Sequence, residues 1–423
     1  MRRYVVAFAI ALAMTVWAGA PARADGDVKA VLKTYADIAH ATYEDSLITA
    51  QALSKAVAAL IGSPSPASLK AAKEAWLAAR VPYQQSEVYR FGNAIVDDWE
   101  GKVNAWPLDE GLIDYVEASY GTSSDENPFY VVNIVANAEL KVGGKSIDAS
   151  NITAELLQNL HEVGDVEANV STGYHAIEFL LWGQDLNGTG AGAGKRPHTD
   201  FDTAHCTGGN CERRAAYLKA VTDLLIADLK DMVANWAEGG KARKGLMDGA
   251  PQAGLVAMLT GMGSLSYGEL AGERMKLGLL LHDPEEEHDC FSDNTHNSHL
   301  YDTVGIRNVY LGVYQRVDGS KVEGPSLSAL VSAKNGDADA ALRTRINATV
   351  AAMHELRKRA EGGEAYDQMI GADNKEGNAA VQTAIDALLD QTKAIEKVVA
   401  SLDLKIGGFE GSDSLDDPSK VFE

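Results

Sequence analysis

The chain has 423 residues, of which 46% are hydrophobic and 23% are charged. This composition is typical of a globular protein with enough apolar residues for two cores, so we expect two domains. The formal net charge of −22 argues against nucleic acid and anionic membrane surfaces as partners.

The N-terminus has the pattern of a secretory signal. Two arginines precede an uncharged run over 4–22, and small residues surround a cleavage site after Ala24. The run is also long enough for an uncleaved membrane anchor, but Pro21 and the small residues favour cleavage. We therefore expect residues 1–24 to be removed, leaving 35 basic against 60 acidic residues and no stable membrane insertion.

Apolar residues recur at helical spacing along most of the chain, and strand-like alternation is scarce. In the second predicted helix, Pro82 indicates a kink or a break. We therefore expect an all-α protein. The predicted helices cover 28–61, 67–91, 151–182, 212–238, 251–282, 326–361 and 378–401.

A Gly-rich stretch without helical period, 186–211, predicts a connecting loop between two bundles over 25–185 and 212–405. In the second bundle, the polar stretch 283–312 predicts a long loop, which its interleaved apolar residues indicate to be ordered. The tail over 406–423 is rich in small and acidic residues, and we expect it to be poorly ordered.

The three cysteines have no zinc-type spacing. Cys206 and Cys211 enclose a short loop that a disulfide could close in an oxidising compartment. Cys290 is then unpaired, and we interpret it as a small buried side chain.

One segment, 171-STGYHAIEFLLWG-183, places His175 and Glu178 on the same face of an apolar helix. Imidazole and carboxylate together suit iron or zinc. A buried hydrogen-bonded pair without metal is the alternative, because HxxE arises readily by chance. Neither standard zinc-protease motif is complete, since Phe179 occupies the position at which the inverted motif requires histidine.

Further ligands would have to come from other segments. Glu87 shares a predicted helix with Arg80 and Tyr83, while Asp98 and Asp109 follow in a turn-rich stretch. A surface salt bridge is the alternative for Arg80 and Glu87, and a helix N-cap is the alternative for Asp109.

The second half offers a separate polar set. Glu269 and Glu273 are helical neighbours, and Arg274 could neutralise one of them. The run 282–289 is acidic and contains histidine, which is more typical of a solvated loop. His296 and His299 are candidate auxiliary ligands.

Several motifs together resemble the imelysin family, in its iron-regulated protein A branch. GYHAIE at 173–178 fits the family's GxHxxE, and the resemblance extends over RVPYxxxE at 80–87, WPxD at 106–109, GELAxERM at 268–275 and CFSDNTH at 290–296. It implies two up-and-down helical bundles, a site near their junction, and a periplasmic or outer-membrane-associated protein linked to iron acquisition. It also implies a metal site at His175 and Glu178 with Glu87, Asp98 or Asp109.

Three hypotheses follow. The first is an envelope protein that binds iron, with zinc or another divalent metal as the alternative ion, and that takes a free or chelated metal and passes it to a transporter. The second is a zinc metallopeptidase. The third is a non-metal binding module whose interdomain cleft captures an organic ligand or a partner protein with Arg80, Glu87, Asp109 and Arg274. Residues expected to line or support the cleft are Arg80, Tyr83, Glu269, Glu273, Arg274, Asp293 and His296.

Overall fold

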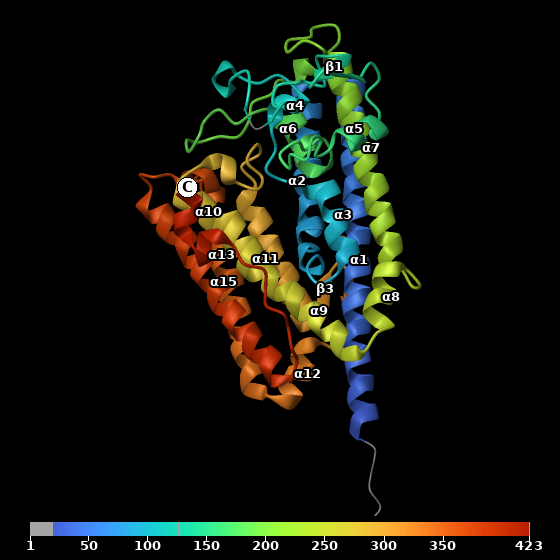
Figure 1. The fold of residues 1–423 in the computed structure, drawn as a ribbon, viewed down its shortest axis with the longest axis vertical. Coiled ribbons are helices and arrows are strands. Elements are labelled where there is room, and N and C mark those ends of the chain that lie inside the picture. Colours follow the sequence, from blue (N-terminus) through green and yellow to red (C-terminus); the bar gives the residue numbers. More distant parts are fainter. Residues whose placement is uncertain (1–19, 126, 423) are drawn as a thin grey trace, which may run out of the picture.

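The computed structural model describes residues 20–125 and 127–422, so most of the predicted signal lies outside the described residues. The described chain is all-α, with two small antiparallel hairpins (Figure 1). Pairing in the hairpins joins Leu140 to Ile147 and Tyr314 to Val322. None of the described helices combines the length and the apolar character that a bilayer span requires.

The first half of the chain supplies α1 Ala20–Gly62, α2 Pro66–Gln84, η1 Glu87–Tyr89, α3 Ala94–Asn104, α4 Glu110–Ile113, η2 Ala118–Tyr120, β1 Glu139–Val142, β2 Lys145–Asp148, α5 Ala154–Leu160, α6 Gly173–Trp182 and η3 His198–Asp200. The second half supplies α7 Cys211–Trp236, α8 Lys241–Met247, α9 Pro251–Ser264, the π-helix η4 Leu265–Lys276, α10 Leu277–Leu281, η5 Pro284–Glu286, α11 Thr295–Leu311, β3 Val313–Gln315, β4 Lys321–Glu323, α12 Leu327–Lys334, α13 Gly336–Glu361, α14 Tyr366–Ile370, α15 Lys375–Ser401, α16 Asp413–Asp416 and η6 Pro418–Phe422.

The α2 helix shows how local sequence sets an element that carries the site. Ser65 forms a capping box with Ser68, and Pro66 occupies the first turn, where its missing N–H is not needed. Pro82 lies near the other end, and the helix stops at Gln84, which confirms the predicted break.

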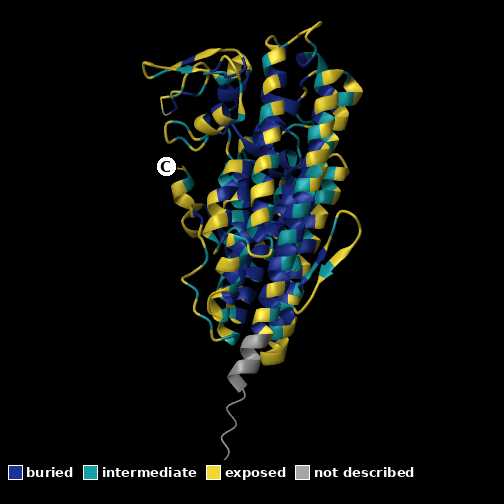
Figure 2. Cartoon of the chain, turned by 90° about the vertical axis from the view of Figure 1, so that its right-hand side faces the viewer, coloured by how far each residue is buried: buried dark blue, intermediate teal, exposed yellow. Residues whose placement is uncertain are grey.

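The helices form two side-by-side groups (Figure 1). In one group α1 packs against α2 and α7; in the other α13 packs against α11 and α15. The predicted division at 186–211 differs from this packing, because α7 follows that loop but lies along α1 and α6. Buried residues of both groups belong to one hydrophobic cluster. Figure 2 shows the buried stretches of the helices in dark blue.

The predicted loop over 283–312 is partly wrong, because 295–311 forms the helix α11. Its apolar residues Leu300, Ile306 and Val309 are buried in the core. Its polar residues Ser298 and His299 are also buried. A helix with polar residues on its inner face lacks the amphipathic pattern on which the prediction rested.

The tail is also better ordered than predicted. Ser414 donates a hydrogen bond to the Gly272 carbonyl at 3.0 Å, so the C-terminal segment lies along η4. A Cβ at Gly268 would come within 2.5 Å of the Glu410 carbonyl oxygen, so the close approach depends on glycine. The segment was misjudged because its docking surface is formed by glycines far away in the sequence.

Cys206 and Cys211 form the disulfide that their spacing allowed, with Cα atoms 5.9 Å apart. Cys290 is a free thiol and partly buried. The disulfide closes the end of the Gly-rich loop directly at the start of α7.

Candidate metal centre

The glycine of the GxHxxE motif has a defined structural role. Gly173 begins α6 with φ +78°, in the left-handed region that favours glycine. A Cβ there would lie 2.4 Å from the carbonyl oxygen of Val103. The absence of a side chain therefore lets α6 begin directly against the end of α3 and places the histidine of the motif in the interior.

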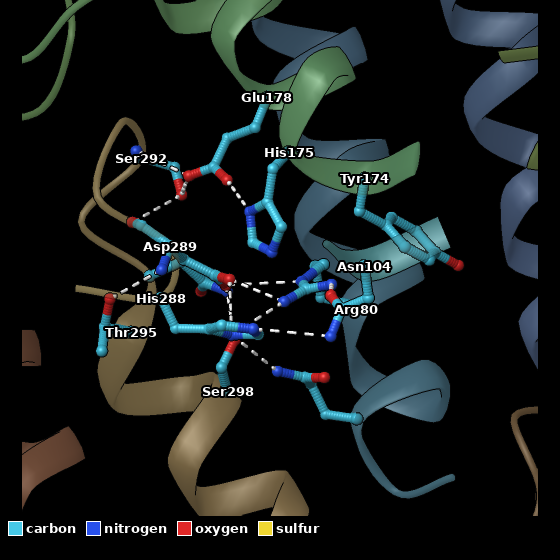
Figure 3. A network of polar contacts seen from close by, with 12 residues as sticks. Arg80, Asn104, Tyr174, His175, Glu178, His288, Asp289, Ser292, Thr295 and Ser298 are labelled. Carbon is cyan, nitrogen blue, oxygen red and sulfur yellow. Dashed lines mark hydrogen bonds and ion pairs between the residues drawn. The ribbon is translucent and has the colours of Figure 1, made fainter. Parts of the chain in front are cut away.

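His175 and Glu178 are both buried and contact each other (Figure 3). His175 Nδ1 lies 3.0 Å from Glu178 Oε2, and the other carboxylate oxygen accepts hydrogen bonds from the backbone N–H and hydroxyl of Ser292. When Glu178 is ionised its carboxylate only accepts, so His175 Nδ1 then carries the hydrogen and Nε2 a lone pair. That Nε2 is buried without a hydrogen-bond partner. Glu178 thus orients the histidine as carboxylates do beside metal ligands.

His288 and Asp289 complete a group with His175. One potential ligand atom from each of the three lies within 4.8 Å of the others, and the two imidazole rings are 4.7 Å apart between centroids. Burial, followed by the positive charge of Arg80, lowers the pKa of His175 to about 3, and burial with Arg274 lowers that of His288. Both imidazoles are therefore neutral, the form in which histidine binds a metal.

Arg80 reaches the same group from α2. Its Nη2 lies 2.7 Å from Asp289 Oδ1 and 3.3 Å from His288 Nδ1, and its Nη1 donates to Asn104 at 2.6 Å. Burial alone would raise the pKa of Asp289, but Arg80 lowers it to about 2. With Glu178 also ionised, the region would hold one negative charge more than positive, which a metal cation would offset.

Burial, followed by the negative charge of Asp289, raises the pKa of Glu178. This carboxyl group therefore ionises more readily when a cation is present beside it. Metal binding and loss of a proton at this position are coupled for that reason.

A second network lies beside this group. Arg274 contacts Glu87 at 2.7 Å, Glu269 at 2.6 Å and Asp302 at 3.2 Å, with all but Glu269 fully buried. Asn104 accepts from Arg80 and donates to Glu100, and Arg90 contacts both Glu100 and Glu269, so this chain of contacts connects the two networks. Glu87 thus forms an ion pair with Arg274 and is not part of the His175 group.

A cavity of about 350 Å³ adjoins His288. Trp106 and Pro107 form part of its wall, and Asn104 lines it next to the His288 imidazole. The charged lining residues are Arg90, Glu100, Glu167, Glu269, Glu273, Arg274 and Glu286. A surplus of carboxylates makes the cavity suitable for a cation that approaches His288.

Two predicted ligands lie elsewhere. Asp98 is exposed on α3, and Asp109 accepts a hydrogen bond from Asn127. Neither joins the group of potential metal ligands found among the described residues. Asp98 and Asp109 are close to the motif in the sequence, whereas the segment that carries His288 and Asp289 lies more than a hundred residues after it.

The supporting residues divide between the two networks. Tyr83 packs its ring against Tyr174, with centroids 4.7 Å apart, behind the motif helix. Glu273 is exposed at the cavity, and Asp293 and His296 lie on the loop and the first turn of α11. Of the residues predicted from sequence, the structure brings His175, Glu178 and Arg80 together directly.

Sequence reasoning missed His288 and Asp289 as site residues. The run 282–289 was interpreted as a solvated loop, but His288 and Asp289 are buried at 2% and 0% relative exposure. Asp289 is held by Asn294 and Ser298, which follow it closely in the chain. The signal that could have found them is their position immediately before the CFSDNTH motif.

His299 gives the protein a testable acid sensitivity. Burial, followed by the charge of Arg274, lowers its pKa to about 3 from 6.5. Below about pH 6.5 this histidine is protonated in the unfolded chain, whereas in the native chain it stays neutral down to about pH 3. The free energy of unfolding therefore decreases as the pH is lowered through this window, by up to about 1.4 kcal/mol per pH unit. His175 and His288 contribute to the same window, so His299→Leu should reduce the pH dependence of the free energy of unfolding by the share of one histidine, measured by urea unfolding at several pH values. His354→Leu, exposed on α13, is the control, and equal slopes in both variants would refute the assignment.

A family model described as imelysin (Peptidase_M75) matches residues 39–395. The chain belongs to the imelysin family. Iron-regulated protein A of Synechococcus elongatus is 39% identical over 51 residues, which span 12% of this chain and 14% of that protein. A crystal structure from Parabacteroides distasonis, described as an iron-regulated protein A precursor, is 21% identical with a TM-score of 0.63 and covers 89% of this chain and 95% of its own. This imelysin therefore shares its fold with a solved structure, and a segment of 51 residues resembles iron-regulated protein A.

Proposed function

We propose that this imelysin is a metal-binding protein of the cell envelope that serves iron uptake or homeostasis. The ion is held by His175, His288 and Asp289. The observation that carries the proposal is the buried Nε2 of His175, which has no partner in the protein and belongs to a side chain directed at the other two (Figure 3).

The donor set favours iron. Two imidazoles and one carboxylate are the protein ligands of many non-haem iron(II) sites, and the same set also suits zinc. Glu178 contacts His175 Nδ1, on the side of the ring away from the proposed ion. Its three hydrogen-bond contacts, with His175 and Ser292, hold it in that position.

The cellular role rests on different support. The similarity to proteins named for iron regulation points to iron, and the charged N-terminal segment followed by an uncharged run points to export. The acidic cavity beside His288 would concentrate cations near the group. An envelope transporter is the proposed recipient of the metal.

Elemental analysis of protein purified from the envelope fraction without added metal tests the proposal. We expect about one equivalent of iron in the unaltered protein and nearly none in a His175→Ala/His288→Ala variant, because two of three ligands are removed. Circular dichroism would establish that the variant is folded.

His205→Ala is the matched control, since its imidazole is exposed and lies in the Gly-rich loop. It should retain the full metal content. Asp98→Asn and Asp109→Asn should also retain it, which distinguishes this ligand set from the one predicted from sequence. Equal metal content in the double variant and the unaltered protein would disprove the site.

A further inference from the structure

One buried arginine lacks partners for two of its donor nitrogens. Among the described residues, the buried arginines are Arg80, Arg196, Arg214 and Arg274. The Nη1 of Arg196 lies 2.8 Å from Asp114 Oδ2 and 3.1 Å from Asp200 Oδ2. Its Nε and Nη2 are buried without a hydrogen-bond partner in the protein. Because an unpaired buried donor costs free energy, two of them on one side chain indicate that an acceptor binds there.

The two unpaired nitrogens form one edge of the guanidinium. The Nε–H and one N–H of Nη2 point in parallel, and this fork matches the two oxygens of a carboxylate. The other buried arginines all present the same edge to carboxylates of the chain, which belong to Asp289 for Arg80, to Asp114 for Arg214, and to Glu269 and Glu87 for Arg274. Arg196 therefore has a carboxylate-binding edge for which the described part of the chain supplies no carboxylate.

This edge lies beside a cavity of about 200 Å³, which Arg196 and Gly183 both line. A Cβ at Gly183 would lie 3.6 Å from Arg196 Nε, so a larger side chain at this position would cover the donor. Arg196 Cζ lies 4.9 Å from the ring centroid of Tyr115 and 5.4 Å from that of Phe179. These two rings hold the guanidinium in position at the cavity wall.

The rest of the lining suits the apolar body of a small organic acid. Tyr115, Trp182 and Leu186 supply apolar surface. A volume of about 200 Å³ is below the roughly 300–1,000 Å³ of cavities that hold drug-sized ligands, so the ligand has few atoms.

The charges around the cavity favour an anion. Its lining contains two cationic residues, Lys195 and Arg196, and one acidic residue, Glu117, which is exposed. The Nζ of Lys73 lies 5.0 Å from the ring centroid of Trp182. Burial, followed by the positive charge of Arg196, lowers the pKa of Lys73 to about 8, and no carboxylate is among these influences. An anion in the cavity would relieve this repulsion between cations.

We propose that this cavity binds a small organic carboxylate. Its two oxygens accept hydrogen bonds from Nε and Nη2 of Arg196, and its body packs against Tyr115 and Leu186. The cavity shares no lining residue with the one beside His288. It adjoins the C-terminal end of α6 at Trp182, whereas His175 lies near the start of that helix. Carboxylate binding is therefore separate from the proposed metal binding.

Ligand-observed NMR titration of the full-length protein with sodium acetate and sodium benzoate tests the proposal, at an ionic strength held constant with NaCl. We expect saturable binding of at least one of these carboxylates. Acetamide and benzamide should not bind, because they keep the shape but lack the negative charge. Leu186→Glu places a competing carboxylate at the cavity and should weaken binding at least about tenfold.

Ile48→Glu is the matched control, since it makes the same change on α1 and should bind as the unaltered protein does. Leu186 and Ile48 are 60% and 49% exposed, so both variants should fold. Arg196→Lys keeps the charge beside Asp114 but lacks the fork, and should abolish binding while circular dichroism reports whether it is folded. His175→Ala should bind normally.

Four results would overturn the proposal. The first is that neither carboxylate binds, and the second is that the amides bind equally well. The third is that Leu186→Glu and folded Arg196→Lys bind as the unaltered protein does. The fourth is tighter binding of inorganic phosphate than of both carboxylates, which would assign the cavity to another class of anion.

Discussion

Arg80→Met is expected to destabilise the metal-free protein by about 3–5 kcal/mol, the usual effect of breaking a buried ion pair from one side. The guanidinium and the Asp289 carboxylate lie 2.7 Å apart at 1% and 0% side-chain exposure. Methionine fills much of the space but leaves Asp289 as an uncompensated buried charge. Urea unfolding followed by tryptophan fluorescence would measure the loss.

Arg345→Met is the matched control. Arg345 also forms an ion pair, with Asp390 at 3.0 Å, but both side chains are about half exposed. Its loss should change stability by about 1 kcal/mol at most. A divalent metal should reduce the stability difference between Arg80→Met and the unaltered protein, because the cation would replace part of the missing positive charge beside Asp289. Equal losses in the two variants would contradict the role given to Arg80.

Gly173→Ala is expected to cost roughly 2–5 kcal/mol, from left-handed backbone strain and from overpacking. The new Cβ would lie 2.4 Å from the Val103 carbonyl oxygen and 2.5 Å from its carbon, and backbone cannot move aside as a flexible side chain can. The same displacement would move His175, two residues later on α6. Calorimetric unfolding and metal content would both report it.

Gly144→Ala separates the two causes. Gly144 has φ +75°, close to the +78° of Gly173, but a Cβ there would meet nothing within 4 Å. This control measures strain alone, so the difference between the variants measures the contact with Val103. If both variants lose the same stability, the close approach of α6 to α3 is not what requires glycine in the motif.

The all-α fold could be predicted because helical periodicity is a local property that each segment carries in its own sequence. The break at Pro82 was predictable for the same reason. The grouping of helices was not, since α7 lies along α1 through contacts between residues far apart in the chain. The helix α11 was not predicted because it buries the polar residues Ser298, His299 and Asp302. In the sequence, such a polar stretch is more typical of a loop.

The candidate site divides in the same way. His175 and Glu178 were found because three residues along a helix fix their relation. His288 and Asp289 lie more than a hundred residues further on, and only tertiary packing places them beside His175. Glu178 was predicted as a ligand, but its contacts with His175 and Ser292 place it behind the histidine. Residue spacing gives no sign of that difference between ligand and supporting group.

The docking of the C-terminal segment on η4 bears on how the protein is handled and processed. Gly268 and Gly272 are covered by residues around Glu410 and Ser412, and the same helix carries Arg274. Proteolysis in the exposed stretch just before this segment would uncover the face of η4 that holds Gly272, two residues from Arg274 and its ion pair with Glu87. A fusion tag at the C-terminus would therefore extend from a packed segment. A cleavage product that lacks this segment would have an altered environment around Arg274.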